Sequence, residues 1–181
     1  MVVLYASQTG NAHNLAKDLY EDASEKGFAV ELADIATWDF AAFVQRAAPL
    51  PVVVIVVSTW TDGTSPPKAQ AAFRALFDNG DRWRHTSLAR MRYAVFGLGN
   101  SVYADNFCKA ARDLDARLHA LGAQRVCARG ELVYINMHVY IYICIHTYIH
   151  TYTYTYTYTY TFTYTYTYTY TYTYTYTYLY I

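Results

Sequence analysis

Charged side chains are absent from the last 50 residues of this 181-residue chain, because all 14 lysines and arginines and all 14 aspartates and glutamates lie at or before Glu131. The three cysteines form neither a CxxC pair nor the spacing of zinc ligands, which argues against a disulfide framework and a metal centre. The net charge of zero gives no sign of a polyanion-binding protein. The opening apolar run is too short for a signal peptide or a membrane span. We therefore expect a cytoplasmic protein with reduced thiols and no membrane segment.

The uncharged segment, residues 132–181, differs in kind from the rest of the chain and holds 18 of the 22 tyrosines. A Thr-Tyr repeat runs from Thr151 to Tyr178 and is broken only at Phe162. The period of two favours strands, yet no turn-forming Gly, Pro, Asn or Asp follows Asn136. The sequence predicts an aggregation-prone, low-complexity tail that is not a domain. Non-coding repeat DNA read in frame would give this pattern, and an adhesive module is the alternative.

Residues 1–131 alternate between apolar runs typical of buried strands and segments with helical spacing. This alternation predicts a doubly wound α/β fold with an open, five-stranded parallel sheet. The expected strands are residues 2–6, 28–32, 52–57, 93–96 and 124–127. The expected helices are one that Gly27 ends and those over residues 36–47, 68–77 and 103–121.

Ligands of such sheets bind beyond the carboxyl ends of the strands, so the segments after the first, third and fourth expected strands are candidate site loops. The first loop combines hydroxyl side chains with a glycine at a helix start, which is a typical anion site; an ordinary helix cap is the alternative. It comprises Ser7, Gln8, Thr9, Gly10, Asn11 and Ala12. With no Lys or Arg in the loop, it suits a phosphate monoester held by amides and hydroxyls.

The other two loops each offer an aromatic face. Trp60 lies in a polar loop whose other candidate residues are Ser58, Thr59, Thr61, Asp62 and Gly63. The third loop contributes Leu98, Gly99, Asn100, Tyr103 and Phe107, and its glycines allow the backbone to approach a ligand. Trp60 as a lid on the core is the alternative reading. A ligand with a phosphate at one end and a flat ring at the other fits all three loops, and flavin mononucleotide (FMN) has that shape.

In order and spacing, the three loops resemble the FMN-binding segments of flavodoxin-like domains. The resemblance implies that residues 7–12 wrap the FMN phosphate and that Trp60 and Tyr103 stack on the two faces of the ring. It also implies that Asp62 and Gly63 border the ring edge, with Leu98, Gly99 and Asn100 contacting it through the backbone and Phe107 closing the pocket. No residue is expected to act as a catalytic nucleophile or acid.

Three strings are more specific: STWTDG at 58–63, MRYAVFGLGNS at 91–101 and LGAQRV at 121–126. They resemble the flavodoxin half of radical S-adenosylmethionine tRNA 4-demethylwyosine synthases, with diflavin reductases as the next best match. The first resemblance implies an iron–sulfur partner domain, and tRNA contact only through that domain. This chain has no CxxxCxxC cluster motif, so the radical chemistry is not expected to occur in it. The resemblance to flavodoxin-like domains implies the strand order 2-1-3-4-5. It ends at Glu131, so the last helix of the fold is expected to be missing, and a truncated fragment that no longer binds FMN is the alternative.

Three further groups of residues carry weaker signals. Arginines 82, 84, 90 and 92 around Trp83 and His85 are expected to form a solvated loop, with docking to a partner or tRNA as the alternative. The cysteines at 108 and 127 are expected to be inert core thiols. The histidines at 138, 146 and 150 have no charged neighbours, so we do not interpret them as metal ligands.

Overall fold

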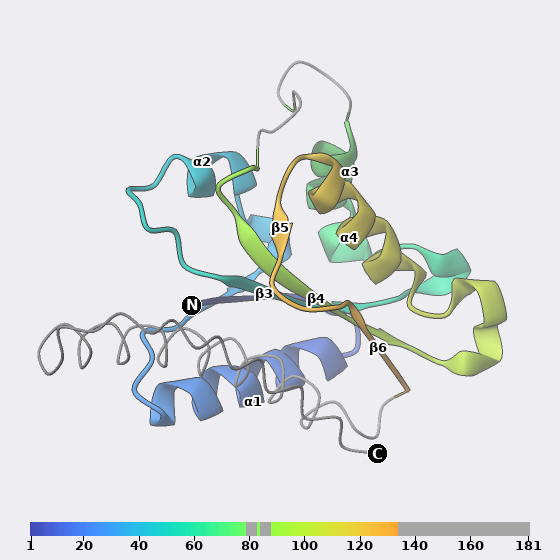
Figure 1. The fold of residues 1–181 in the computed structure, drawn as a ribbon. Coiled ribbons are helices and arrows are strands. Elements are labelled where there is room, and N and C mark those ends of the chain that lie inside the picture. Colours follow the sequence, from blue (N-terminus) through green and yellow to red (C-terminus); the bar gives the residue numbers. More distant parts are fainter. Residues whose placement is uncertain (79–82, 84–87, 134–181) are drawn as a thin grey trace, which may run out of the picture. The chain divides into compact units, whose positions relative to one another are not determined.

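The computed structural model describes residues 1–78, 83 and 88–133. It contains a parallel sheet in the order β2-β1-β3-β4-β5, with β6 also pairing with β4 (Figure 1). The strands are β1 (Val2–Ala6), β2 (Glu31–Asp34), β3 (Val53–Ser58), β4 (Arg92–Gly99), β5 (Gln124–Arg125) and β6 (Gly130–Val133). The doubly wound α/β fold is confirmed, and the strands follow the predicted order.

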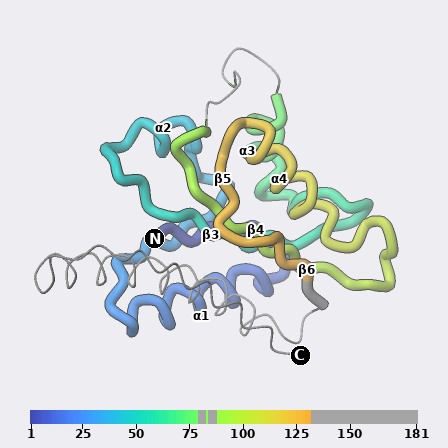
Figure 2. The backbone as a smooth tube through the Cα atoms, in the orientation of Figure 1, coloured from blue at the N-terminus to red at the C-terminus, as the bar shows by residue number. Residues whose placement is uncertain are grey.

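Helices lie on both faces of the sheet, as Figures 1 and 2 show. Helix α1 (Asn11–Glu25) packs on one face, against β1 and β3. Helices α3 (Gln70–Phe77) and α4 (Lys109–Ala120) pack on the other face, beside the short helix α2 (Phe40–Val44). Within the described residues, α1 is the only helix on its face. The predicted absence of a last helix concerns residues beyond the described ones, and so does nearly all of the tail predicted at 132–181.

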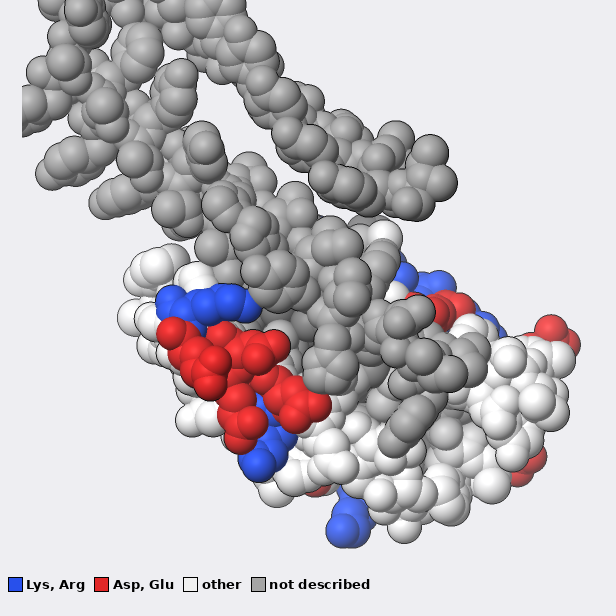
Figure 3. Space-filling view, turned by 90° about the horizontal axis from the view of Figure 1, so that it is seen from below, with Lys and Arg blue, Asp and Glu red and all other residues white. Residues whose placement is uncertain are grey.

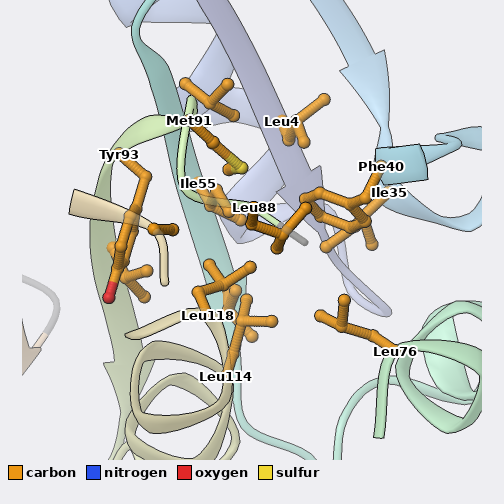
Figure 4. Packing of buried hydrophobic residues seen from close by; sticks show 14 of the residues in the cluster. Leu4, Ile35, Phe40, Ile55, Leu76, Leu88, Met91, Tyr93, Leu114 and Leu118 are labelled. Carbon is orange, nitrogen blue, oxygen red and sulfur yellow. The ribbon is translucent and has the colours of Figure 1, made fainter. Parts of the chain in front are cut away.

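The main core lies between the sheet and the α3–α4 layer (Figure 4). Leu4 and Ile55 project from the central strands toward Leu114 and Leu118 of α4 and Leu76 of α3, and all are buried. Trp83 joins this core and donates from Nε1 to the carbonyl of Ala75 at 2.6 Å. Alternating residues of β1 and β3 supply this face because side chains along a strand point to opposite sides.

The sequence had suggested that Trp83 belongs to a solvated loop. That prediction is wrong for Trp83, because its side chain is buried in the core. Arg90 donates to the carbonyls of Val44 (2.8 Å) and Arg46 (3.2 Å), and Arg92 donates to that of Leu50 at 3.5 Å. These hydrogen bonds connect the end of α2 and the segment that follows it to the start of β4. Arg82, Arg84 and His85 lie outside the described residues.

Several predicted elements have different bounds. β2 begins at Glu31 and not at residue 28. The helix predicted over 36–47 is divided into a 3₁₀ turn η1 (Ile35–Thr37) and α2 (Phe40–Val44). Each piece has its own aspartate cap, since Asp34 accepts from the amide of Ala36 and Asp39 from those of Ala41 and Ala42.

The helix predicted from residue 103 begins only at Lys109. A 3₁₀ segment, η5 (Ser101–Asn106), precedes it, and the positive φ values of Ala104 (44°) and Cys108 (51°) interrupt the helical path. Cys108 is buried, as predicted, whereas Cys127 is only partly buried. None of the helices in the described ranges combines the length and apolar character needed to cross a bilayer.

The two short strands β5 and β6 are pieces of one interrupted edge. Arg92 and Tyr93 of β4 pair with β5, and residues 96–99 of the same strand pair with β6. Residues 126–129 bulge out between the two pieces. The predicted strand over 124–127 thus ends two residues early and resumes at Gly130.

A buried carboxylate on α4 holds both sides of this interruption. Asp115 accepts from Arg125 Nε at 2.7 Å, from Arg129 Nη1 at 2.8 Å and from the Tyr93 hydroxyl at 3.0 Å. Burial alone would raise the pKa of Asp115, but the hydrogen bonds from Arg125, Tyr93 and Arg129 outweigh it and bring the pKa below its usual value. Burial, followed by the Asp115 charge, raises the pKa of the Tyr93 phenol.

Candidate functional site

The three candidate loops begin at one edge of the sheet. Ala6 at the end of β1 pairs with Val57 of β3, and Ser58 pairs with Leu98 of β4. The Thr59 amide donates to the Leu98 carbonyl at 2.9 Å, which extends the pairing into the second loop. The 3₁₀ turn η2 (Thr61–Gly63) of that loop contacts η5 of the third loop. The structure therefore brings together the segments that the sequence predicted to form one site.

The first loop leads directly into α1, whose N-cap residue Gly10 has no side chain that could cap the helix. Ser7 Oγ accepts from the Gly10 amide at 3.0 Å, which closes the loop. Gly10 has φ 96°, and a Cβ built on it would meet nothing within 4 Å, so the loop faces open space there. The first N–H groups of a helix have no intrahelical acceptor, and their dipoles favour an anion.

The distribution of acidic side chains along α1 favours binding of an anion at the N-terminal end of this helix. The first turn carries no acidic side chain, whereas Glu21, Asp22 and Glu25 are exposed in the second half of the helix. Viewed from the α1 side, the largest group of acidic side chains lies together with lysine and arginine side chains, and smaller acidic patches lie elsewhere (Figure 3). Of the other predicted residues here, Gln8, Thr9 and Asn11 are exposed and Ala12 is buried.

The second loop presents Trp60 to the outside. Its side chain is 37% exposed, and it is not among the residues that form or pack against the core cluster. The Trp60 amide donates to the Thr64 carbonyl at 2.8 Å, and Asp62 adopts a left-handed conformation with φ 58°. Thr61 and Asp62 are exposed, and Ser58 is partly buried.

Thr59 carries the most informative polar atom of this loop. Its Oγ1 is buried and has no hydrogen-bond partner among the residues that the structure describes. Buried hydroxyls are normally paired, because an unpaired one loses its bonds to water without replacement. At this edge of the sheet the Thr59 hydroxyl is available to a polar group of a ligand.

The third loop also exposes an aromatic ring. Asn100 accepts from the Val102 amide at 3.0 Å and so caps η5. Tyr103 is 67% exposed and Val102 82% exposed, which is unusual for large apolar side chains. Leu98 is buried. Sequence reasoning did not single out Val102, because a lone valine in a loop carries no motif.

The glycines of the second and third loops make room for the chain itself. A Cβ on Gly99 would lie 2.7 Å from the Cys108 amide nitrogen and 3.0 Å from the Phe107 ring, and one on Gly97 would lie 2.8 Å from the Ala111 Cβ. A Cβ on Gly63 would likewise come too close to the side chains of Asn106 and Lys109. From the sequence we predicted that the glycines at 97 and 99 let the backbone approach a ligand. In the structure their lack of a side chain also makes room for the start of α4. Phe107 thus packs behind the loop.

A comparison with known proteins now identifies the family. A protein-family model described as Flavodoxin matches residues 3–138, which is well over half of the chain. The chain belongs to the flavodoxin family. A short-chain flavodoxin associated with a PDU bacterial microcompartment superposes with a TM-score of 0.59 at 20% identity, covering 73% of this chain and 82% of that one. This structural likeness supports the fold.

Two relatives illustrate the larger proteins in which this flavodoxin domain occurs. The S-adenosyl-L-methionine-dependent tRNA 4-demethylwyosine synthase TYW1 of Danio rerio is 37% identical over 132 residues, which are 71% of this chain and 18% of that protein. The sulfite reductase (NADPH) flavoprotein alpha-component of Baumannia cicadellinicola subsp. Homalodisca coagulata is 38% identical over 129 residues, which are 71% of this chain and 20% of that protein. The chain therefore spans about a fifth of these relatives.

Flavodoxins bind FMN, and this chain is a flavodoxin-like FMN-binding electron-transfer domain. Its geometry fits that cofactor. The uncapped helix start suits a phosphate, the orphaned Thr59 hydroxyl suits a polar group, and the exposed Trp60 and Tyr103 suit a flat ring.

Proposed function

We propose that this domain delivers electrons, through bound FMN, to an iron–sulfur partner domain of the TYW1 type. Two facts support this: the 37% identity to the Danio rerio TYW1 region and the strings at 58–63 and 91–101 that resemble that group. In this proposal the protein is cytoplasmic, and tRNA is met only by the partner domain.

The chain's own residues would bind and orient the cofactor. Ser7, Gly10 and the amides that open α1 would hold the phosphate, and Thr59 Oγ1 would donate to or accept from the ligand. Trp60 and Tyr103 would cover the two ring faces and exclude water from them. FMN supplies the electron-transfer chemistry, and the protein supplies binding, orientation and electrostatics. The exposed Trp60, in a polar loop at the carboxyl edge of the sheet, is the observation that supports this assignment most directly.

Substitution of Trp60 tests the binding part. In a titration of the full chain with FMN, Trp60→Ala should remove the quenching of flavin fluorescence and weaken binding by about 1–3 kcal/mol, the range for stacking on an aromatic side chain. Phe28→Ala is the matched control, since Phe28 is similarly exposed (36%) but lies in the connection from α1 to β2. Equal binding by the two variants would contradict the assignment of Trp60.

The choice of partner needs a separate experiment. The FMN-loaded chain, chemically reduced, is mixed with a TYW1-type iron–sulfur domain or with the FAD domain of a sulfite reductase flavoprotein. Bleaching of the cluster absorbance supports the proposal. The second candidate, a diflavin reductase, is favoured by the 38% identity to the Baumannia protein, and electron exchange only with the FAD domain would select it.

A further inference from the structure

Arg112 on α4 supports the third loop from behind. One guanidinium nitrogen, Nη1, donates to the Phe107 carbonyl, and the other, Nη2, donates to the Asp105 carbonyl. Both carbonyls lie just after Tyr103, the residue assigned to one face of the ring. A single side chain thus fixes two points of the segment that carries Tyr103.

Burial in the core does not hold the third loop in place, because no residue of η5 is buried. Two non-glycine residues have positive φ, Ala104 at 44° and Cys108 at 51°, and such conformations persist only where surrounding contacts enforce them. The bonds from Arg112 span the interval between these two residues, where an enforcing contact is needed.

Arg112 is in turn connected to the buried carboxylate of α4. Its Nη1 lies 3.9 Å from Glu131 Oε2, and Glu131 Oε1 lies 2.8 Å from Arg129 Nη2. Arg129 Nη1 then lies 2.8 Å from Asp115 Oδ2. The charged groups facing Arg112 therefore form a continuous series from the ring loop to the interior. Such a series limits where the Arg112 guanidinium can move.

We propose that Arg112 is a positioning residue for the flavin ring, which it affects only through the third loop. The proposal rests on FMN binding at the site described above. A guanidinium presents its donors in a fixed planar fork that reaches two acceptors at once, whereas a lysine ammonium does not hold that geometry. Arg112 thus sets where Tyr103 and the backbone at 98–100 meet the ring.

The chain contains a matched control on the same helix. Arg117 also donates to two carbonyls, to Leu76 at 2.8 Å and to Asp78 at 3.0 Å, but these lie at the end of α3. Arg112→Met and Arg117→Met therefore remove the same kind of contact at different places. Both variants are made in the full chain and titrated with FMN and with riboflavin, which has the ring but no phosphate.

Arg112→Met should raise the dissociation constants of FMN and riboflavin in parallel by about tenfold, equivalent to about 1.4 kcal/mol. The ratio of the two constants, which reports the phosphate loop, should not change, and bound FMN should show an altered visible circular dichroism spectrum. Arg117→Met should change neither constant by more than about twofold. Arg112→Lys should fall between wild type and Arg112→Met, because it keeps the charge but loses the fork.

Three outcomes would overturn the proposal: equal effects of Arg112→Met and Arg117→Met, a changed ratio of the two constants, or wild-type binding by Arg112→Met. Failure of the wild-type chain to bind FMN would refute the proposed function instead, and so is distinguishable. If far-ultraviolet circular dichroism shows Arg112→Met to be unfolded, Arg112→Lys decides. A parallel rise of both constants then supports positioning, and unchanged constants refute it.

Discussion

Replacement of Asp115 by asparagine tests how the buried ion network stabilises the interrupted edge of the sheet. Both carboxylate oxygens face only donors: Oδ1 accepts from Tyr93 and Arg125 Nε, and Oδ2 from Arg125 Nη2 and Arg129 Nη1. An amide in either orientation turns its NH₂ group toward a guanidinium. Asp115→Asn should therefore lose hydrogen bonds and gain a donor–donor repulsion.

The expected loss follows from the burial of the partners. Breaking a fully buried ion pair costs about 3–5 kcal/mol, and a hydrogen bond to a charged group contributes about 1.5–3 kcal/mol. The Asp115 side chain is 3% exposed, but those of Arg125 and Arg129 are 34% and 29% exposed, so water compensates part of the loss. We expect the free energy of unfolding to fall by about 2–4 kcal/mol.

Urea unfolding of the full chain, followed by circular dichroism, measures this change. Asp113→Asn is the control, because Asp113 lies on the same helix and pairs with Lys109, but its side chain is 44% exposed. An exposed pair of this kind contributes about 0.5 kcal/mol or less. Similar losses in the two variants would refute the reasoning that the Asp115 network is an important stabilising contact.

The pH dependence gives an independent check of the same network. The pKa of Asp115 is lowered in the folded state, so its stabilising contribution is present above the unfolded carboxyl pKa of about 3.9 and is lost as pH falls through the folded-state value. The difference between wild type and Asp115→Asn should be constant between about pH 5 and pH 7 and shrink below about pH 4. A difference that grows on acidification would contradict the lowered pKa.

Two substitutions test the packing of the site itself. Thr59→Val removes a buried hydroxyl that has no partner in the described part of the chain, so the apo chain should gain up to about 1 kcal/mol in urea unfolding while its FMN affinity falls; a less stable apo chain with unchanged affinity would count against this. Gly97→Ala places a Cβ 2.8 Å from the Ala111 Cβ and 2.9 Å from the Cys108 Cβ and should cost about 1–3 kcal/mol, whereas unaltered stability would show that α4 does not pack closely on β4.

Most strands and helices of residues 1–131 were predictable from the sequence because their signals are local, whereas the order of the strands was implied by the family resemblance. The β-branched run at 52–57 matches β3, and glycines mark the ends of α1 and α4, where Gly27 and Gly122 have φ values of 85° and 90°. The site loops were predictable for the same reason, since they follow directly from the strands. Their meeting at one edge is a consequence of parallel strand order.

Other features depend on contacts between distant residues. The spacing of Tyr103 and Phe107 suits a helix, but the close approach of Cys108 to Gly97 and Gly99 requires a left-handed turn that delays α4 to Lys109. The roles of Arg112 and Asp115 carry no motif, because their partners lie on other elements. The division of the edge strand depends on the same contacts and was not predictable for that reason.

FMN binding by this domain is best tested by titrating the purified full chain with FMN. We expect one FMN to bind per chain with strong quenching of flavin fluorescence, and riboflavin to bind more weakly because the uncapped start of α1 then holds no phosphate. A folded chain that leaves flavin fluorescence unchanged, or that binds riboflavin as tightly as FMN, would contradict it.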